Sequence, residues 1–178
     1  MKTLIVVDMQ NDFIDGSLAN PAAAAIVEPM AEYIKSFDGQ ILFTQDTHYE
    51  NYLETQEGKN LPIPHCILPT EGWWVHDRLL EAIEEKFNGY PFREDWCFAH
   101  KNSFGDISIL AEQINDGTDE IYLCGTCTDI CVISIALNLK ARFPEIKMYC
   151  IADLCAGLTP EKHAAALEVM RSCQIEVI

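Results

Sequence analysis

Short, nearly uninterrupted apolar runs recur along the chain, separated by segments in which apolar residues recur with helical spacing. A short continuous apolar run is typical of a strand covered on both faces, as in a parallel sheet. The sequence therefore predicts strands at 4–8 (LIVVD), 41–46, 96–99, 121–125 and 147–153, and a last strand at 174–178.

The segments between these runs are amphipathic and predict helices, at 21–37, 76–87, 107–116, 129–143 and 160–173. Pro29 should kink the first helix or mark its true start. Thr159 followed by Pro160 has the residues of a helix start. Strand and helix alternating about five times predict a three-layer α/β/α sandwich with a mainly parallel, Rossmann-like sheet of about six strands. We expect one domain over 1–178, whose long segment 47–75 is functional.

Composition argues against several classes of partner. The chain has 28 Asp and Glu against 12 Lys and Arg, a net charge of −16, which repels phosphate backbones and anionic lipids. Neither nucleic acid nor a membrane is therefore expected, and no apolar run reaches spanning length. Several of the eight cysteines lie in apolar runs, where cysteine acts as a small hydrophobe. We expect a reduced, cytoplasmic protein.

Reactive side chains follow three of the predicted strands. In parallel α/β sheets, ligands bind outside the carboxyl ends of the strands. Asp8 ends the first strand, Lys101 follows the third, and the fourth leads into the cysteine-rich stretch GTCTDICVISIA (125–136). Taken singly, Asp8 would more often be a loop residue or a helix cap, and Lys101 would more often be a solvated loop residue. Their shared position at one sheet edge favours a site.

Among the cysteines of this stretch, Cys131 has the setting of a nucleophile. Cys124 lies within the apolar run, where core packing is expected. Thr128 is a natural N-cap for the following helix, which would put Cys131 in its first turn. Free amides and a nearby lysine at such a position lower the pKa of a thiol. The amides of Cys127 and Cys131 could then face a developing oxyanion. Alternatively, these three thiols bind a metal or act as a redox switch.

At this point the chain resembles a known family, the isochorismatase-like cysteine hydrolases, which include nicotinamidases. The resemblance rests on VVDMQNDF near the start, the lysine after the third strand, GTCTDICVISIA, and ADLCAGLTPEKHAAAL near the end. It implies a triad of Asp8, Lys101 and Cys131, and a cis peptide between Thr126 and Cys127. It also implies hydrolysis of a small amide through a thioester, with release of ammonia.

A second cluster is expected around the long segment 47–75. Asp46-Thr-His48 is followed by a segment that ends in Pro-His65. These histidines could be ordinary loop residues, but in nicotinamidases a similar pattern binds a divalent metal that coordinates the ring nitrogen of the substrate. The resemblance implies Asp46, His48 and His65 as ligands, with Glu57 preferred over Glu54 as the fourth. Such ligands suit Zn²⁺, Fe²⁺ or Mn²⁺.

The aromatic wall of the substrate pocket departs from the pattern of nicotinamidases. Many of these enzymes have an aromatic residue three positions before the second histidine, where this chain has Pro62. Phe13, or Trp73 and Trp74, could supply the wall instead, and the two tryptophans could equally be core or interface residues. The substrate therefore stays open between nicotinamide, a carbamoyl compound and an isochorismate-type ether. A catalytically silent binding module is a further alternative. We also expect a homo-oligomer.

Overall fold

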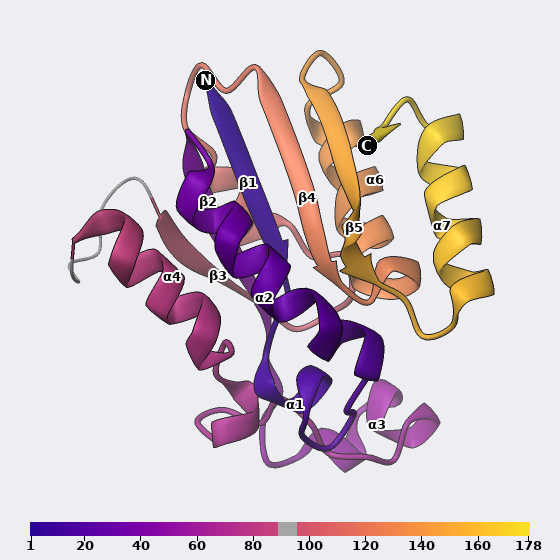
Figure 1. The fold of residues 1–178 in the computed structure, drawn as a ribbon. Coiled ribbons are helices and arrows are strands. Elements are labelled where there is room, and N and C mark those ends of the chain that lie inside the picture. The colour runs from indigo at the N-terminus through magenta and orange to yellow at the C-terminus, as the bar shows by residue number, and fades with distance from the viewer. Residues whose placement is uncertain (89–95) are drawn as a thin grey trace.

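Six parallel strands form one sheet in the order β3-β2-β1-β4-β5-β6 (Figure 1). The computed structural model describes residues 1–88 and 96–178. The strands are β1 (Lys2–Val7), β2 (Gln40–Asp46), β3 (Trp96–Lys101), β4 (Glu120–Thr126), β5 (Lys147–Ala156) and β6 (Glu176–Val177). The predicted fold class is confirmed, and the strand order is that of dinucleotide-binding folds.

The central strands are buried on both faces, as their apolar runs predict. From Leu4 to Val7 in β1 every residue is fully buried, and β2 is buried along its whole length. Leu4 lies opposite Ile41 on one side and Tyr122 on the other, so the same apolar layer continues across the sheet. Burying a run of this kind supplies most of the stabilisation of such a sheet.

Helices cover both faces of the sheet. The helices are α1 (Asn11–Ile14), α2 (Pro21–Ser36), α3 (Gln56–Asn60), α4 (Asp77–Phe87), α5 (Ser108–Gln113), α6 (Ile133–Arg142) and α7 (Pro160–Ser172), of which α1 and α3 lie beyond the carboxyl end of the sheet. In Figure 1, α2 and α4 lie in front of the sheet and α6 lies behind it. Pro29 lies inside α2, which begins at Pro21 with Asn20 as its cap, so Pro29 does not mark the start. Thr159 caps α7 as predicted.

Several predicted boundaries are wrong: β5 runs on to Ala156, α5 ends at Gln113, and two further elements differ more. The helix predicted at 129–143 begins with a π-helical turn, Thr128–Val132, for which Cys127 takes the cap position. Thr128 is therefore not the N-cap, and its hydroxyl lies 2.9 Å from Nδ1 of His163 on α7. The last strand is only two residues long, and it pairs with β5 alone at the edge of the sheet.

The long segment 47–75 contains short helical turns and crosses the carboxyl end of the sheet. Besides α3, it contains the 3₁₀ turns Tyr52–Glu54 and Glu71–Trp73. An isolated bridge between His48 and Ile67 joins two parts of the segment, and a second one, between Gln10 and Val75, connects the segment to the residues that follow β1. The segment therefore lies over the strand ends where ligands bind in such sheets. None of the helices in the described part of the chain is long and apolar enough to cross a membrane.

Candidate active site at the carboxyl end of the sheet

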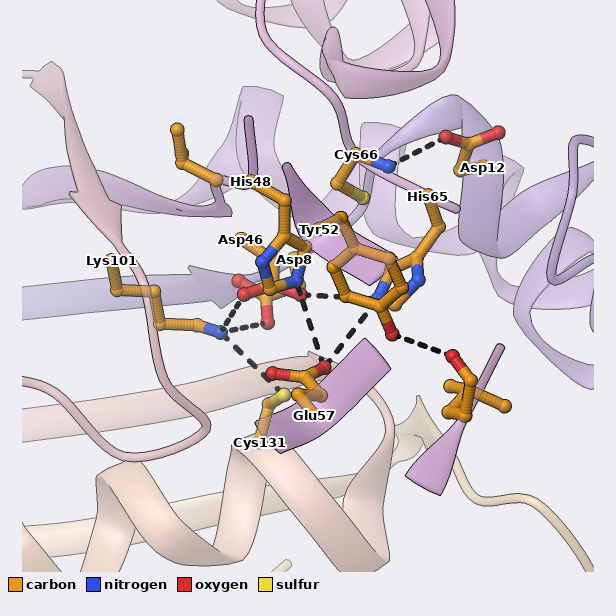
Figure 2. A network of polar contacts seen from close by, with 12 residues as sticks. Asp8, Asp12, Asp46, His48, Tyr52, Glu57, His65, Cys66, Lys101 and Cys131 are labelled. Atoms are coloured by element: carbon orange, nitrogen blue, oxygen red, sulfur yellow. Dashed lines mark hydrogen bonds and ion pairs between the residues drawn. The ribbon is translucent and has the colours of Figure 1, made fainter. Parts of the chain in front are cut away.

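Lys101 lies between the other two residues of the predicted triad, Asp8 and Cys131, and contacts both (Figure 2). It is the last residue of β3, and its side chain is 1% exposed. Its Nζ lies 2.7 Å from Oδ2 of Asp8 and 3.6 Å from Sγ of Cys131. These residues come from β3, the end of β1 and the turn after β4, so the strand order brings them together.

The main chain and Thr44 hold Asp8 in position. Asp8 follows β1 directly and has φ of 48°, in the left-handed region that aspartate tolerates better than most residues. The Thr44 hydroxyl donates to Oδ1 of Asp8 at 2.6 Å and accepts from the Asp8 amide at 3.2 Å. With Oδ2 paired to Lys101, both oxygens of this fully buried carboxylate have polar partners.

Burial and charge determine the pKa of each group in the triad. Burial raises the pKa of Asp8, although the charge of Lys101 acts in the opposite direction. Burial alone would lower the pKa of Lys101, but the negative charges around it raise that pKa well above its ordinary value. Lys101 is therefore a permanent cation, and Asp8 is a stronger base than an exposed aspartate.

The sequence-based expectation that the pKa of Cys131 is lowered is wrong. Burial and the charge of Asp8 raise the pKa of this thiol well above its ordinary value, and Lys101 opposes them only in part. The thiol thus needs a base, and Asp8, whose negative charge already acts on this thiol, is the candidate. Cys124 is fully buried in β4, as expected for a packing residue.

The peptide bond between Thr126 and Cys127 is cis, where the resemblance implied it. The Thr126 hydroxyl donates to the carbonyl of Ala156 at 3.2 Å. The carbonyl of Cys127 accepts from the amides of Ile130 and Val132 within the π-helical turn. The amides at the beginning of a helical segment have no partners within it, so those of Cys127 and Cys131 are candidates for an oxyanion hole.

Two carboxylates and two imidazoles converge beside the triad (Figure 2). One ligand atom of each residue lies within 4.8 Å of those of the others, and the residues are Asp46, His48, Glu57 and His65. Nε2 of His48 is 3.1 Å from Oδ2 of Asp46 and 3.6 Å from Oε1 of Glu57. Glu54 is exposed at the end of its 3₁₀ turn, so of the two glutamates only Glu57 joins this metal-ligand cluster.

The metal-ligand cluster has the chemistry that a divalent cation needs. Nδ1 of His65 lies 2.9 Å from the carbonyl of Ile63, which leaves Nε2 to face the cluster. Burial and the charge of Asp46 raise the pKa of Glu57, because adjacent carboxylates repel each other. A cation between them would relieve that repulsion. Two imidazole nitrogens with two carboxylates suit Zn²⁺, Fe²⁺ or Mn²⁺. The four residues of the metal-ligand cluster therefore fit a divalent cation.

Lys101 links the metal-ligand cluster to the triad. Its Nζ lies 3.2 Å from Oδ1 of Asp46, while Oδ2 of the same carboxylate faces His48 and His65. Burial alone would raise the pKa of Asp46, but the histidine hydrogen bonds and Lys101 hold it well below its usual range. Asp46 is therefore an anion that both groups of residues share.

Gln10 is a positioning residue that the sequence analysis did not identify. Its fully buried amide donates to the carbonyls of Asp46, at 2.9 Å, and Trp73, at 2.7 Å. Its Oε1 accepts from the Asp46 amide at 2.7 Å. The side chain thus pairs with the end of β2 where β1 has already stopped. Asp12, also missed, accepts from the Cys66 amide at 2.7 Å, next to His65. Both residues belong to VVDMQNDF, but their partners are distant in sequence.

A cavity of about 560 Å³ opens onto the reactive groups. Cys127, Cys131, Asp46 and His65 are among the residues that line it. Phe13, the expected aromatic wall, also lines it, with its ring 5.6 Å from that of His65. The pair at 73–74 does not line this cavity: the first tryptophan is buried and donates to Thr47 at 3.0 Å.

The chain is similar to known proteins along almost its whole length. The family model described as the isochorismatase domain matches residues 2–178. The nicotinamidase/pyrazinamidase of Mycobacterium tuberculosis is 28% identical over 185 residues, which cover 100% of this chain and 98% of that protein. The pyrazinamidase of Pyrococcus horikoshii in complex with zinc superposes with a TM-score of 0.78 at 28% identity, covering 99% of this chain and 98% of that one. The nicotinamidase/pyrazinamidase of Bacillus subtilis gives 0.79 at 25% identity, with the same coverage.

Proposed function

The chain belongs to the isochorismatase family, and we propose that it is a nicotinamidase-like amidohydrolase that cleaves a small amide by cysteine-dependent chemistry. One observation carries this proposal. The thiol of Cys131, with its base and its cation, lies at a cavity that Asp46 and His65 of the metal-ligand cluster also line. Similarity to a nicotinamidase/pyrazinamidase over the whole chain supports it.

In the proposed reaction, Asp8 accepts the proton of the Cys131 thiol, and the thiolate attacks the amide carbonyl. The amides of Cys127 and Cys131 donate to the oxyanion that develops. As the C–N bond breaks, Asp8 returns the proton to the departing ammonia, which leaves a thioester on Cys131. Water then cleaves the thioester, releasing the carboxylic acid and the free thiol.

Lys101 makes the proton transfer feasible in a buried site. Before the transfer the anion is the Asp8 carboxylate, 2.7 Å from Nζ. Afterwards it is the Cys131 thiolate, whose sulfur lies 3.6 Å from the same nitrogen. The net charge of the triad is unchanged, so neither state leaves an unpaired buried charge. The raised pKa of Asp8 also makes it a better match for a thiol.

We propose that the metal-ligand cluster of Asp46, His48, Glu57 and His65 holds a divalent cation. When bound, such a cation would act as a Lewis acid for the ring nitrogen of a heteroaromatic amide. A pyrazinamidase with a similar fold is described as a complex with zinc, which supports this assignment.

The residues that line the cavity favour an uncharged substrate. Within the part of the chain that the structure describes, no lysine or arginine lines the cavity. An isochorismate-type substrate carries carboxylates, which would find no cationic side chain there and would meet an acidic protein. The thiol-based alternative also lacks support: among the described residues, Cys124, Cys127 and Cys131 do not form a metal-ligand group.

The wider setting of the enzyme is also a proposal. All eight cysteines are free thiols, which supports a reducing compartment such as the cytoplasm. We propose one domain over 1–178, because a single core cluster spans the sheet, and a homo-oligomer, which light scattering would test.

Ammonia release tests the proposed function directly. The purified protein, as isolated and after loading with Zn²⁺, Mn²⁺ or Fe²⁺, is assayed with nicotinamide, pyrazinamide and a panel of carbamoyl compounds. We expect turnover of the ring amides that Cys131→Ala abolishes. Ammonia release from none of these compounds under any loading would refute the proposal and favour a silent binding module.

A further inference from the structure

The cavity is larger than a bare pyridine carboxamide requires. Nicotinamide has nine non-hydrogen atoms, and even at the roughly 30 Å³ of a liquid water each they would fill about 270 Å³. The cavity measures about 560 Å³. About half of it therefore stays unfilled by such a ring, and pockets of this size usually hold larger ligands.

Burial divides the cavity into an inner and an outer end. At the inner end, Cys131 and His65 are 5% and 2% exposed. At the outer end, Phe104 and Leu158 are 46% and 49% exposed, although both line the same cavity. Phe104 lies in the loop after β3 and Leu158 in the loop before α7. The outer end is thus walled by large apolar side chains from two separate loops.

The charged side chains that line the cavity all belong to the metal-ligand cluster, and the outer end has none. Besides Phe104 and Leu158, the exposed lining residues in the described part of the chain are Gln56 and Asn60 of α3, which carry neutral amides. Exposed aromatic and aliphatic side chains that line a cavity mouth indicate a ligand-binding surface, here on a protein with a net charge of −16. This combination suits a neutral, apolar group with a few polar atoms at its edge.

Resting on the proposed function, we infer that the preferred substrate is a heteroaromatic carboxamide with an apolar substituent, and that Phe104 and Leu158 bind that substituent. A ring with its carboxamide at Cys131 and its nitrogen toward His65 has one carbon adjacent to neither the nitrogen nor the carboxamide-bearing carbon. In nicotinamide this is the 5-position, the ring carbon from which a substituent reaches the outer end of the cavity. Phe104 and Leu158 are then specificity-determining residues.

The test compares kcat/KM for nicotinamide, 5-phenylnicotinamide and 5-carboxynicotinamide in the metal-loaded enzyme, measured as ammonia release. We expect the 5-phenyl compound to exceed nicotinamide by about tenfold, through a lower KM, because the apolar wall binds the added ring. The 5-carboxy compound occupies the same position with a negative charge, and it should be at least tenfold worse than nicotinamide.

Variants at the outer end then locate the effect. Phe104→Ala and Leu158→Ala should each lower the ratio of 5-phenyl to unsubstituted kcat/KM by about fivefold to tenfold. Phe104→Leu, which retains apolar surface, should keep most of that ratio. Ile109→Ala is the matched control, because Ile109 is also 46% exposed but does not line the cavity. It should leave the ratio within twofold of the wild-type value.

The possible outcomes separate this inference from the proposed function. Turnover of nicotinamide with a 5-phenyl ratio below one, or a ratio that neither alanine variant changes, overturns the inference and leaves the amidohydrolase intact. A change of molar mass in the Phe104→Ala variant with an unchanged ratio would assign the outer end to contact between subunits, and would also overturn it. If no ring amide releases ammonia, the proposed function fails and the inference fails with it.

Discussion

Replacing Gln10 by leucine should destabilise the protein strongly, although the hydrogen bonds of the Gln10 side chain go to Asp46 and Trp73 and not to Cys131 or Asp8. The Gln10 side chain is fully buried and hydrogen-bonds to both main-chain groups of Asp46 and to the carbonyl of Trp73. Leucine fills a similar volume without polar atoms. The Trp73 carbonyl keeps a donor in Gln45, at 3.1 Å, but the amide and carbonyl of Asp46 lose these partners.

The expected cost follows from the number of groups left unpaired. A buried main-chain group without a partner costs about 1–3 kcal/mol, so two of them predict a loss of about 2–6 kcal/mol in the free energy of unfolding. Urea-induced unfolding with a chelator present measures this value for the protein alone. Gln56→Leu is the matched control, because Gln56 is exposed at the start of α3. It should change the free energy by no more than about 0.5 kcal/mol.

A second measurement connects the loss to the site. Because Gln10 holds the main chain of Asp46, the affinity for Zn²⁺ should fall in the Gln10→Leu variant, as measured by competition with a chromogenic chelator. A loss of less than about 1 kcal/mol in unfolding free energy would show that water or a main-chain shift satisfies Asp46. The positioning role of Gln10 would then be wrong.

Asp8→Asn should lower kcat by about 10²–10⁴-fold with an unchanged circular dichroism spectrum, since an amide cannot accept the thiol proton, and a loss below tenfold would contradict the role of general base. Cys131→Ala should abolish turnover while Cys124→Ala keeps it; peptide mapping after iodoacetamide treatment checks the assignment, which is wrong if activity disappears with alkylation of Cys124. His48→Ala should raise KM as a chelator does, and a chelator added to that variant should do little more. Lys101→Met removes the charge that lowers the pKa of Asp8, so that pKa should rise further above its unfolded value. Such a carboxyl gains protons on folding, so its contribution to the free energy of unfolding falls as pH rises through the folded pKa. In urea unfolding, the variant should therefore lose more free energy of unfolding relative to the wild type at pH 8 than at pH 5. Equal losses at the two pH values would contradict this.

The sequence determined the layers of the fold and the members of the proposed triad, because both depend on local patterns. Continuous apolar runs mark doubly covered strands whichever strands they pair with. A charged residue at the end of such a run is placed at the sheet edge by topology alone, which is why Asp8 and Lys101 could be predicted. The helix start predicted after the fourth strand singled out Cys131. The resemblance to a family then added the metal-ligand cluster, and the structure distinguishes Glu57 from Glu54.

What only the tertiary structure decided are the contacts between distant segments. Burial of the whole triad raises the pKa of Cys131, whereas the position of this thiol near a helix start had suggested the opposite. Thr128 pairs with His163, thirty-five residues away, in place of capping its own turn. Gln10 and Asp46 meet because β1 ends earlier than β2 at the same edge. Hydrogen bonds and desolvation depend on which groups exclude water from one another, and this is decided by the packing of the folded chain.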